Sequence, residues 1–180
     1  PAVQQSGMSQ ALSAHSKIKV KKVDFGLPVE AHKVYGTPAD CTKLAVEVLY
    51  ENDLPDMIIS GINDGGNLGT DVLYSGTVGA AMEGHLHGIL SIAVSRVVGS
   101  ELSFAEVAQI SSQKLPNFRN EKPYMYNINF PKKIADQNDI FRYTKQGRRT
   151  YHNEYAIEIN EQGEKCYFMN GTHNDAGNIE

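Results

Sequence analysis

Short apolar runs and helical segments alternate between residues 37 and 131, and this alternation constrains the fold more than any other feature. Three runs are typical of buried strands: "DMIIS" at 56–60, "ILSIAVSRV" at 89–97 and "YMYNINFP" at 124–131. Helical patterns precede and separate them, over residues 38–49, 76–88 and 103–115. Because this order favours a parallel sheet with helices on its faces, we expect a three-layer α/β/α fold with a mostly parallel sheet.

The flanking parts of the chain predict further strands. "IKVKKVDF" at 18–25 and "AHKVYG" at 31–36 are short strand candidates. Residues 154–169 alternate on both sides of Glu161-Gln162-Gly163, which predicts a hairpin within a projecting region at 141–175. We expect a single domain over residues 1–180. The absence of an initial Met and the polar last residues predict a fragment that is incomplete at both ends.

The composition of the chain limits the kinds of partner that it can bind. The 180 residues are 41% hydrophobic, which suffices for the core of one domain. The formal net charge is -4, so no basic footprint for a nucleic-acid polymer is present. No apolar stretch is long enough to span a membrane, and the two cysteines have no metal-site spacing. We therefore expect a cytoplasmic protein with reduced thiols.

A glycine-rich loop follows the strand at 56–60 and leads into a helix that opens at Ser75-Gly76-Thr77. In open α/β sheets, ligands bind beyond the carboxyl ends of the strands. Unpaired amides and the positive end of the helix dipole suit a phosphate there, although Ser and Thr are also ordinary N-cap residues. Asn63 is either a turn residue or an oxygen ligand for a hard cation. Asp64 and Asp71 do not form an adjacent acidic pair, so the sequence contains half of a metal site.

Several segments closely resemble one family. "SGINDGGNLGTDVLYSGTVGAAMEG" at 60–84 resembles the SurE survival-protein family of metal-dependent 5′-nucleotidases. "YGTPADCTKLA" at 35–45 is similar to the family's Gly-Thr-Pro-x-Asp-Cys segment, and "PAVQQSGMSQALS" at 1–13 to its Pro-Asp-x-x-x-Ser-Gly-x-Ser loop. "YTKQGRRTY" at 143–151 is similar to the segment before the family's projecting hairpin. The resemblance covers nearly the whole chain in the family's order.

The resemblance implies a Rossmann-like hydrolase with one divalent ion per subunit, Mg or Mn. By motif, Ser6 and Asn63 correspond to metal ligands that act in catalysis. Substrate phosphate binding is implied for Gly7, Asn67, Ser75, Gly76 and Thr77. The family's Asn-Asp-Asp-Gly aspartate pair and its final Gly-Tyr-x-x-x-Thr-Pro-Leu strand have no counterpart in these residues, and Ala2 replaces the usual acidic residue.

For the intact protein, the resemblance implies hydrolysis of nucleoside 5′-monophosphates. The ion would orient the phosphate and lower the pKa of a bound water. The resemblance also implies a homodimer or homotetramer assembled through the hairpin. Two alternatives remain open: an exopolyphosphatase, since a phosphate site does not select nucleosides, and a non-catalytic phosphate-binding module, since the aspartate pair is missing. We expect residues 1–180 alone to be inactive.

Two adjacent arginines, Arg148 and Arg149, stand with Tyr151 just before the predicted hairpin. Our interpretation of these three residues is a solvated strand end. Contact with substrate or with a neighbouring subunit is the alternative.

Overall fold

The chain is divided into two compact units. The computed structural model describes residues 1–175 except 4, 6, 116–117, 119–124 and 135–140. The larger unit comprises Pro1–Asn67 and Val72–Arg142, and the smaller comprises Leu68–Asp71 and Tyr143–Glu180. The segment Leu68–Asp71, which lies in the glycine loop, therefore groups with the C-terminal part of the chain.

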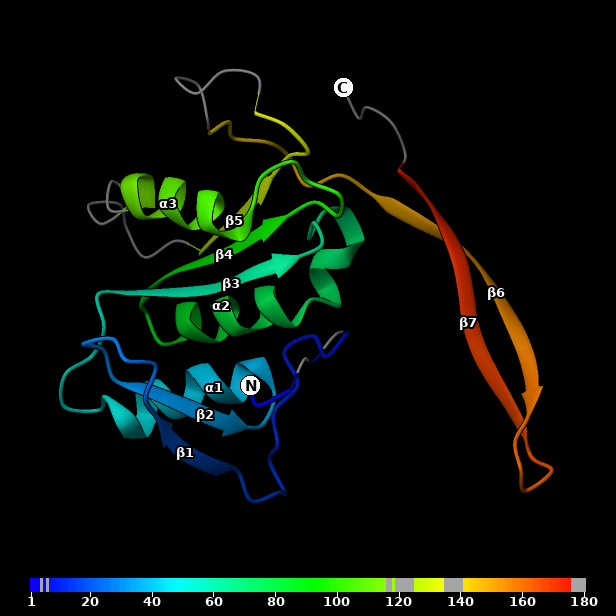
Figure 1. Ribbon diagram of the computed structural model, residues 1–180, viewed down its shortest axis with the longest axis horizontal. Coiled ribbons are helices and arrows are strands. Elements are labelled where there is room, and N and C mark those ends of the chain that lie inside the picture. The colour runs from blue at the N-terminus through cyan, green and yellow to red at the C-terminus, as the bar shows by residue number, and fades with distance from the viewer. Residues whose placement is uncertain (4, 6, 116–117, 119–124, 135–140, 176–180) are drawn as a thin grey trace. The chain divides into compact units, whose positions relative to one another are not determined.

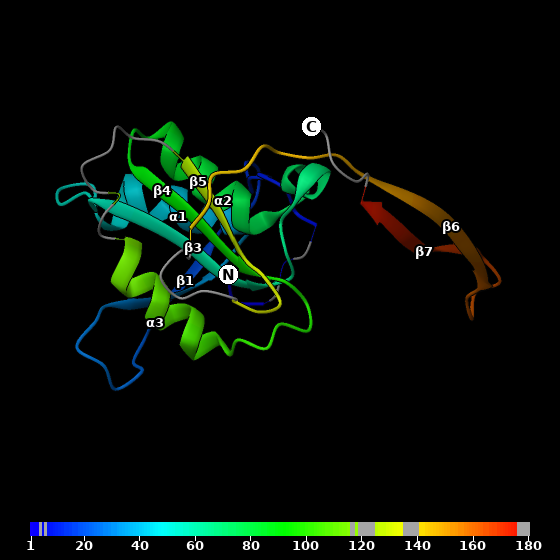
Figure 2. The same cartoon turned by 90° about the horizontal axis from the view of Figure 1, so that it is seen from above.

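A parallel sheet forms the centre of the larger unit. Its strands are β3 (Met57–Asp64), β4 (Leu90–Arg96) and β5 (Met125–Phe130), in the order β3-β4-β5. Figure 2 shows the three strands from above. The prediction of parallel strands is confirmed, but the end expected for the first strand is wrong. The strand crosses a register irregularity after Ser60 and pairs again at Asn63, so the loop begins four residues later than expected.

Helices α2 (Gly76–Leu86) and α3 (Phe104–Lys114) cover opposite faces of this sheet (Figure 1). Successive residues of a strand point to opposite faces. Accordingly, Ile92 of β4 belongs to one buried cluster with Val107 of α3, and Ala93 belongs to another with Ala81 of α2. The α/β/α layering expected from the sequence is therefore confirmed.

Helix α1 (Pro38–Leu44) begins as predicted. The Thr37 side chain accepts a hydrogen bond from the Asp40 amide, and the Asp40 side chain accepts one from the Thr37 amide, which completes a capping box. The helix continues as one π-helical turn, η1 (Ala45–Leu49). Strands β1 (Lys19–Val23) and β2 (Ala31–Tyr35) pair in antiparallel fashion, at the predicted positions.

The smaller unit contains the predicted hairpin. Strands β6 (Arg149–Ile159) and β7 (Lys165–Asp175) pair antiparallel, with Tyr155 opposite Met169 and Ile157 opposite Tyr167. Both strands extend beyond the predicted range of 154–169. Within the described residues, no helix is long and apolar enough to cross a membrane.

Candidate functional site

Polar side chains of β4 and β5 hold the glycine loop at the carboxyl edge of the sheet. Asn67 is 6% exposed, and its side-chain amide donates to the Ser95 hydroxyl at 2.6 Å. Its backbone amide donates to Oδ1 of Asn129 at 2.7 Å, and its carbonyl accepts from Nδ2 of Asn127 at 2.8 Å. One residue of the loop is therefore held by side chains of β4 and β5.

The sequence analysis did not single out Ser95, Asn127 or Asn129. Asparagine is depleted in strands, because its side chain competes for backbone hydrogen bonds. Asn127 and Asn129 stand two residues apart in one strand, and this spacing places both on the same face. That pattern is the signal by which they could have been found.

Asn63 lies at the end of β3 with its side chain partly buried. Its Nδ2 donates to the carbonyl of Gly65 at 2.7 Å, and no described donor pairs with its Oδ1. The neighbouring Asp64 carboxylate is engaged, since it accepts from Nε of Arg96 at 2.9 Å. The Asn63 oxygen is therefore available to bind a cation.

Helix α2 begins at the predicted Ser-Gly-Thr. Ser75 is the N-cap, and its hydroxyl oxygen accepts from the Val78 amide at 3.1 Å. The Gly79 amide donates to the Ser75 carbonyl at 2.9 Å. Among the described residues, no acceptor pairs with the amides of Gly76 and Thr77. Two free N–H groups at the positive end of an 11-residue helix can bind an anion.

Gly76 has a packing role as well. A Cβ at this position would lie 2.9 Å from Cγ of Pro38 and 3.2 Å from the carbonyl oxygen of Gln5. The lack of a side chain therefore lets the first residue of α1 and the N-terminal loop approach the start of α2. Close approach of a ligand is not the only reason for a glycine here.

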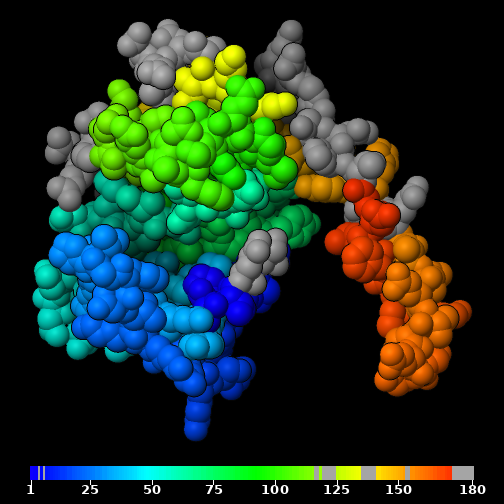
Figure 3. Space-filling view, viewed as in Figure 1, coloured from blue at the N-terminus to red at the C-terminus, as the bar shows by residue number. Residues whose placement is uncertain are grey.

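The N-terminal loop is fastened to the segment that precedes α2. The Ser9 amide donates to the carbonyl of Tyr74 at 2.9 Å, and the Ser9 hydroxyl donates to that of Leu73 at 2.6 Å. The dark-blue N-terminal residues accordingly pack against the body of the larger unit in Figure 3. Gly7 is exposed near this contact, with φ +70. Ser6, the other predicted metal ligand, lies outside the described residues.

The described residues fit a divalent ion only in part. They contain no group of three or more His, Cys, Asp or Glu side chains that could hold a metal ion. The Asn63 amide oxygen is an oxygen donor of the kind that Mg²⁺ accepts, but Mg²⁺ sites usually also use one or two carboxylates. The Asp64 and Asp71 carboxylates are bound to arginines instead.

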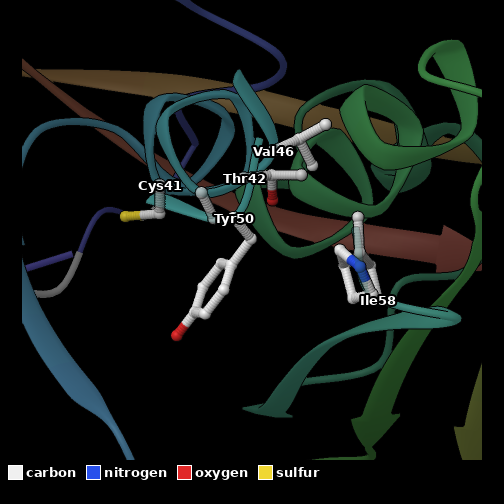
Figure 4. A pocket seen from close by; sticks show the side chains of 7 residues that line it. Cys41, Thr42, Val46, Tyr50 and Ile58 are labelled. Carbon is white, nitrogen blue, oxygen red and sulfur yellow. The ribbon is translucent and has the colours of Figure 1, made fainter. Parts of the chain in front are cut away.

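A hollow of about 250 Å³ lies elsewhere, between α1, η1 and β3 (Figure 4). It is lined mostly by apolar groups, and the side chains around it include those of Cys41, Val46, Tyr50 and Ile58. None of the predicted site residues lines it. Because a phosphate needs donors, we place the candidate site at the start of α2 and not in this hollow.

Comparisons with known proteins agree over nearly the whole length of the chain. The family described as Survival protein SurE matches residues 1–153. A 5′-nucleotidase SurE of Petrotoga mobilis is 39% identical over 95% of this chain and 69% of its own length. One of Clostridium beijerinckii is 40% identical over 97% of this chain and 71% of its own length.

A solved structure agrees as well. The crystal structure of the SurE protein from Aquifex aeolicus superposes with a TM-score of 0.70 at 35% identity, and the match covers 92% of this chain and 67% of that chain. An identity of this size, over nearly the whole chain and with the same fold, is decisive. The chain belongs to the SurE survival-protein family.

Proposed function

We propose that the intact protein hydrolyses nucleoside 5′-monophosphates to nucleoside and phosphate, with a divalent metal ion as cofactor. The observation that carries this proposal is the 39% identity, over 95% of the chain, to a relative named 5′-nucleotidase. The free amides at the start of α2 support it, because they suit the phosphate group that all these substrates share.

In the proposed reaction, water attacks phosphorus and the bond from phosphorus to the 5′ oxygen breaks. The leaving oxygen takes up a proton and forms the nucleoside. The amides of Gly76 and Thr77 would bind phosphoryl oxygens and stabilise the charge that develops on them. The Ser75 oxygen already accepts from Val78, so its hydroxyl hydrogen is available to donate to the phosphate. Gly7 and Asn67 complete the proposed phosphate site.

Ser6 and Asn63 are the residues that we assign to the metal, Mg or Mn, with one ion per subunit. When bound, such an ion supplies Lewis acidity toward water and phosphate. The described residues complete no ligand shell around such an ion.

The proposal is tested by phosphate release from AMP and GMP, measured on the full-length protein with and without EDTA. We expect activity that EDTA abolishes and that Mg²⁺ or Mn²⁺ restores. Activity that persists in EDTA contradicts the proposed mechanism. If phosphate is released from polyphosphate but not from AMP or GMP, the protein is an exopolyphosphatase and not a nucleotidase.

Two variants separate metal binding from phosphate binding. We expect Asn63→Ala to raise the metal concentration for half-maximal activity at least about 10-fold, because it removes an oxygen ligand. We expect Ser75→Ala to raise KM for AMP about 5-fold, since it removes one hydrogen bond to the phosphate. Titrations of metal and of AMP measure the two effects.

Each variant has a matched control. Asn52→Ala removes an asparagine from an exposed loop and is expected to leave the metal titration unchanged. Ser103→Ala removes the N-cap of α3, which accepts from the Glu106 amide at 3.2 Å in the way that Ser75 caps α2. A KM increase in Ser103→Ala equal to that in Ser75→Ala assigns the effect to loss of a cap. Unchanged kinetics in both site variants contradict the assignments.

The proposal includes assembly of a homodimer or homotetramer through the hairpin. In the antiparallel register, alternate residues of both strands share one face. On one such face five apolar side chains are 59–64% exposed: Tyr155, Ile157, Ile159, Tyr167 and Met169. A two-stranded hairpin cannot bury such a face by itself, so a second copy of the chain is the partner that we propose. The cytoplasmic location stays a prediction, which cell fractionation tests.

A further inference from the structure

The glycine loop is divided between the two units of the chain. Asn67, a proposed phosphate ligand, belongs to the larger unit, whereas Leu68–Asp71 groups with the hairpin. The chain then returns to the larger unit and reaches Ser75, the N-cap of α2. The conformation of the loop between two proposed ligands is therefore set in part by residues that follow much later in the sequence.

One acidic side chain links the segment Leu68–Asp71 to the base of the hairpin within the smaller unit. Oδ2 of Asp71 accepts from Nη1 of Arg149 at 2.5 Å, and Oδ1 accepts from the hydroxyl of Tyr151. The two charged side chains are only 17% and 14% exposed, respectively. An ion pair so shielded is less screened than a surface pair, and both carboxylate oxygens are engaged. The interpretation of Arg149 as a solvated strand end is therefore wrong.

The tyrosine is a hydrogen-bond donor in this cluster. Burial raises the pKa of the Tyr151 hydroxyl, and its hydrogen bond to Asp71 raises it further, while Arg149 acts in the opposite direction. The hydroxyl therefore keeps its proton at neutral pH. The Asp71 carboxylate has a donor on each oxygen.

Backbone contacts hold the same segment. The hydroxyl of Thr70 donates to the Arg149 carbonyl at 2.6 Å, and Nε2 of Gln146 donates to the Gly69 carbonyl at 3.0 Å. Gly69 has φ +54, and a Cβ there would lie 3.0 Å from the Arg149 nitrogen and 3.2 Å from the Gly147 oxygen. Both its conformation and its surroundings favour glycine.

We propose that Asp71, Arg149 and Tyr151 form a positioning cluster, through which the base of the hairpin sets the loop between Asn67 and Ser75 for phosphate binding. None of the three is proposed to touch the substrate. Both oxygens of Asp71 are bound by protein donors, so this carboxylate acts on the loop and not on a metal ion. This proposal deepens the proposed function and rests on it.

The test uses the full-length enzyme with saturating metal, and three variants: Arg149→Met, Asp71→Asn and the double variant. We expect each single variant to raise both KM for AMP and the inhibition constant of inorganic phosphate about 10-fold, while kcat changes less than about 3-fold. A 10-fold change corresponds to about 1.4 kcal/mol, the scale of a charge-assisted hydrogen bond. The double variant is expected to be no worse than either single one, because both remove the same interaction.

Arg148→Met is the matched control. Arg148 is the exposed neighbour of Arg149, and its substitution removes the same charge. We expect its KM and its phosphate inhibition constant to stay within 2-fold of wild type. If Arg148→Met raises both constants as much as Arg149→Met does, the loss of positive charge alone explains the effect, and the positioning proposal is overturned.

Two further outcomes overturn the proposal. If Arg149 contacts the substrate directly, Arg149→Met loses affinity while Asp71→Asn does not. If both variants keep wild-type constants, the cluster has no role in the site. Thermal melts followed by circular dichroism check folding, and Arg149→Lys and Tyr151→Phe replace any variant that fails to fold.

Failure of the proposed function is distinguishable from failure of this inference. Wild-type protein without activity on AMP contradicts the nucleotidase proposal. Calorimetric titration of wild type and variants with inorganic phosphate then still measures whether the cluster sets phosphate affinity.

Discussion

At the scale of single residues, Asp40 shows how one buried carboxylate joins the N-terminal loop to a helix. It is 3% exposed and accepts from the Thr37 amide at 2.8 Å, and from the amide and hydroxyl of Ser13 at 2.9 and 2.7 Å. Burial alone raises the pKa of the Asp40 carboxyl, but these hydrogen bonds outweigh it and hold the pKa below its ordinary value.

We expect Asp40→Asn to lower the free energy of unfolding by about 2 kcal/mol at neutral pH, because it turns one acceptor into a donor. Since the folded-state pKa is lowered, the stabilisation is complete above the unfolded pKa of about 3.9 and is lost as pH falls through the folded value. Urea unfolding between about pH 5 and pH 2 measures this loss in the wild type. Asp53→Asn, in an exposed loop, is the control. If the difference in unfolding free energy between wild type and Asp40→Asn does not shrink as the pH falls, the role assigned to the Asp40 carboxylate is contradicted.

At the scale of elements, the start of α2 is limited by packing. Alanine is a better helix former than glycine, and propensity alone predicts that Gly76→Ala stabilises the protein. A methyl group 2.9 Å from Pro38 predicts the opposite, a loss of about 1–3 kcal/mol. Thermal melts decide, with Gly147→Ala as control, because a Cβ at Gly147 meets no atom within 4 Å. If Gly76→Ala melts at a higher temperature than wild type, the predicted loss is contradicted, and α1 moves away from the new methyl group at little cost in free energy.

At the scale of the whole molecule, the assembly that we propose uses one face of the hairpin. We expect Ile157→Lys, on the apolar face, to weaken self-association at least about 10-fold, since it puts a charge into the proposed interface. Ala156→Lys adds the same charge to the opposite face and is expected to keep the wild-type mass. Light scattering after size-exclusion chromatography measures the masses. A wild-type protein that is monomeric at micromolar concentration contradicts the proposed assembly.

Periodicity and capping predicted most of the architecture. The parallel strands, the start of the helix at Pro38 and the turn of the hairpin all appeared where the pattern placed them. Each depends on residues within a few positions of one another. The prediction failed at the end of β3, because pairing with β4 resumes after an irregularity that periodicity does not reveal. The sequence pattern also did not predict the π-helical turn. A hydrogen bond from the Tyr50 amide to the Ala45 carbonyl closes this turn.

The sequence by itself determined the class of fold, the helix starts and the family, because local hydrophobic spacing, caps and short motifs are written in neighbouring residues. Only the tertiary structure decided what holds the glycine loop. Asn67 is bound by Asn129, 62 residues away, and Asp71 by Arg149, 78 residues away. Such partners follow from the order of strands in the sheet and from the grouping of a loop with a distant hairpin. Neither is expressed in the spacing of residues along a single chain.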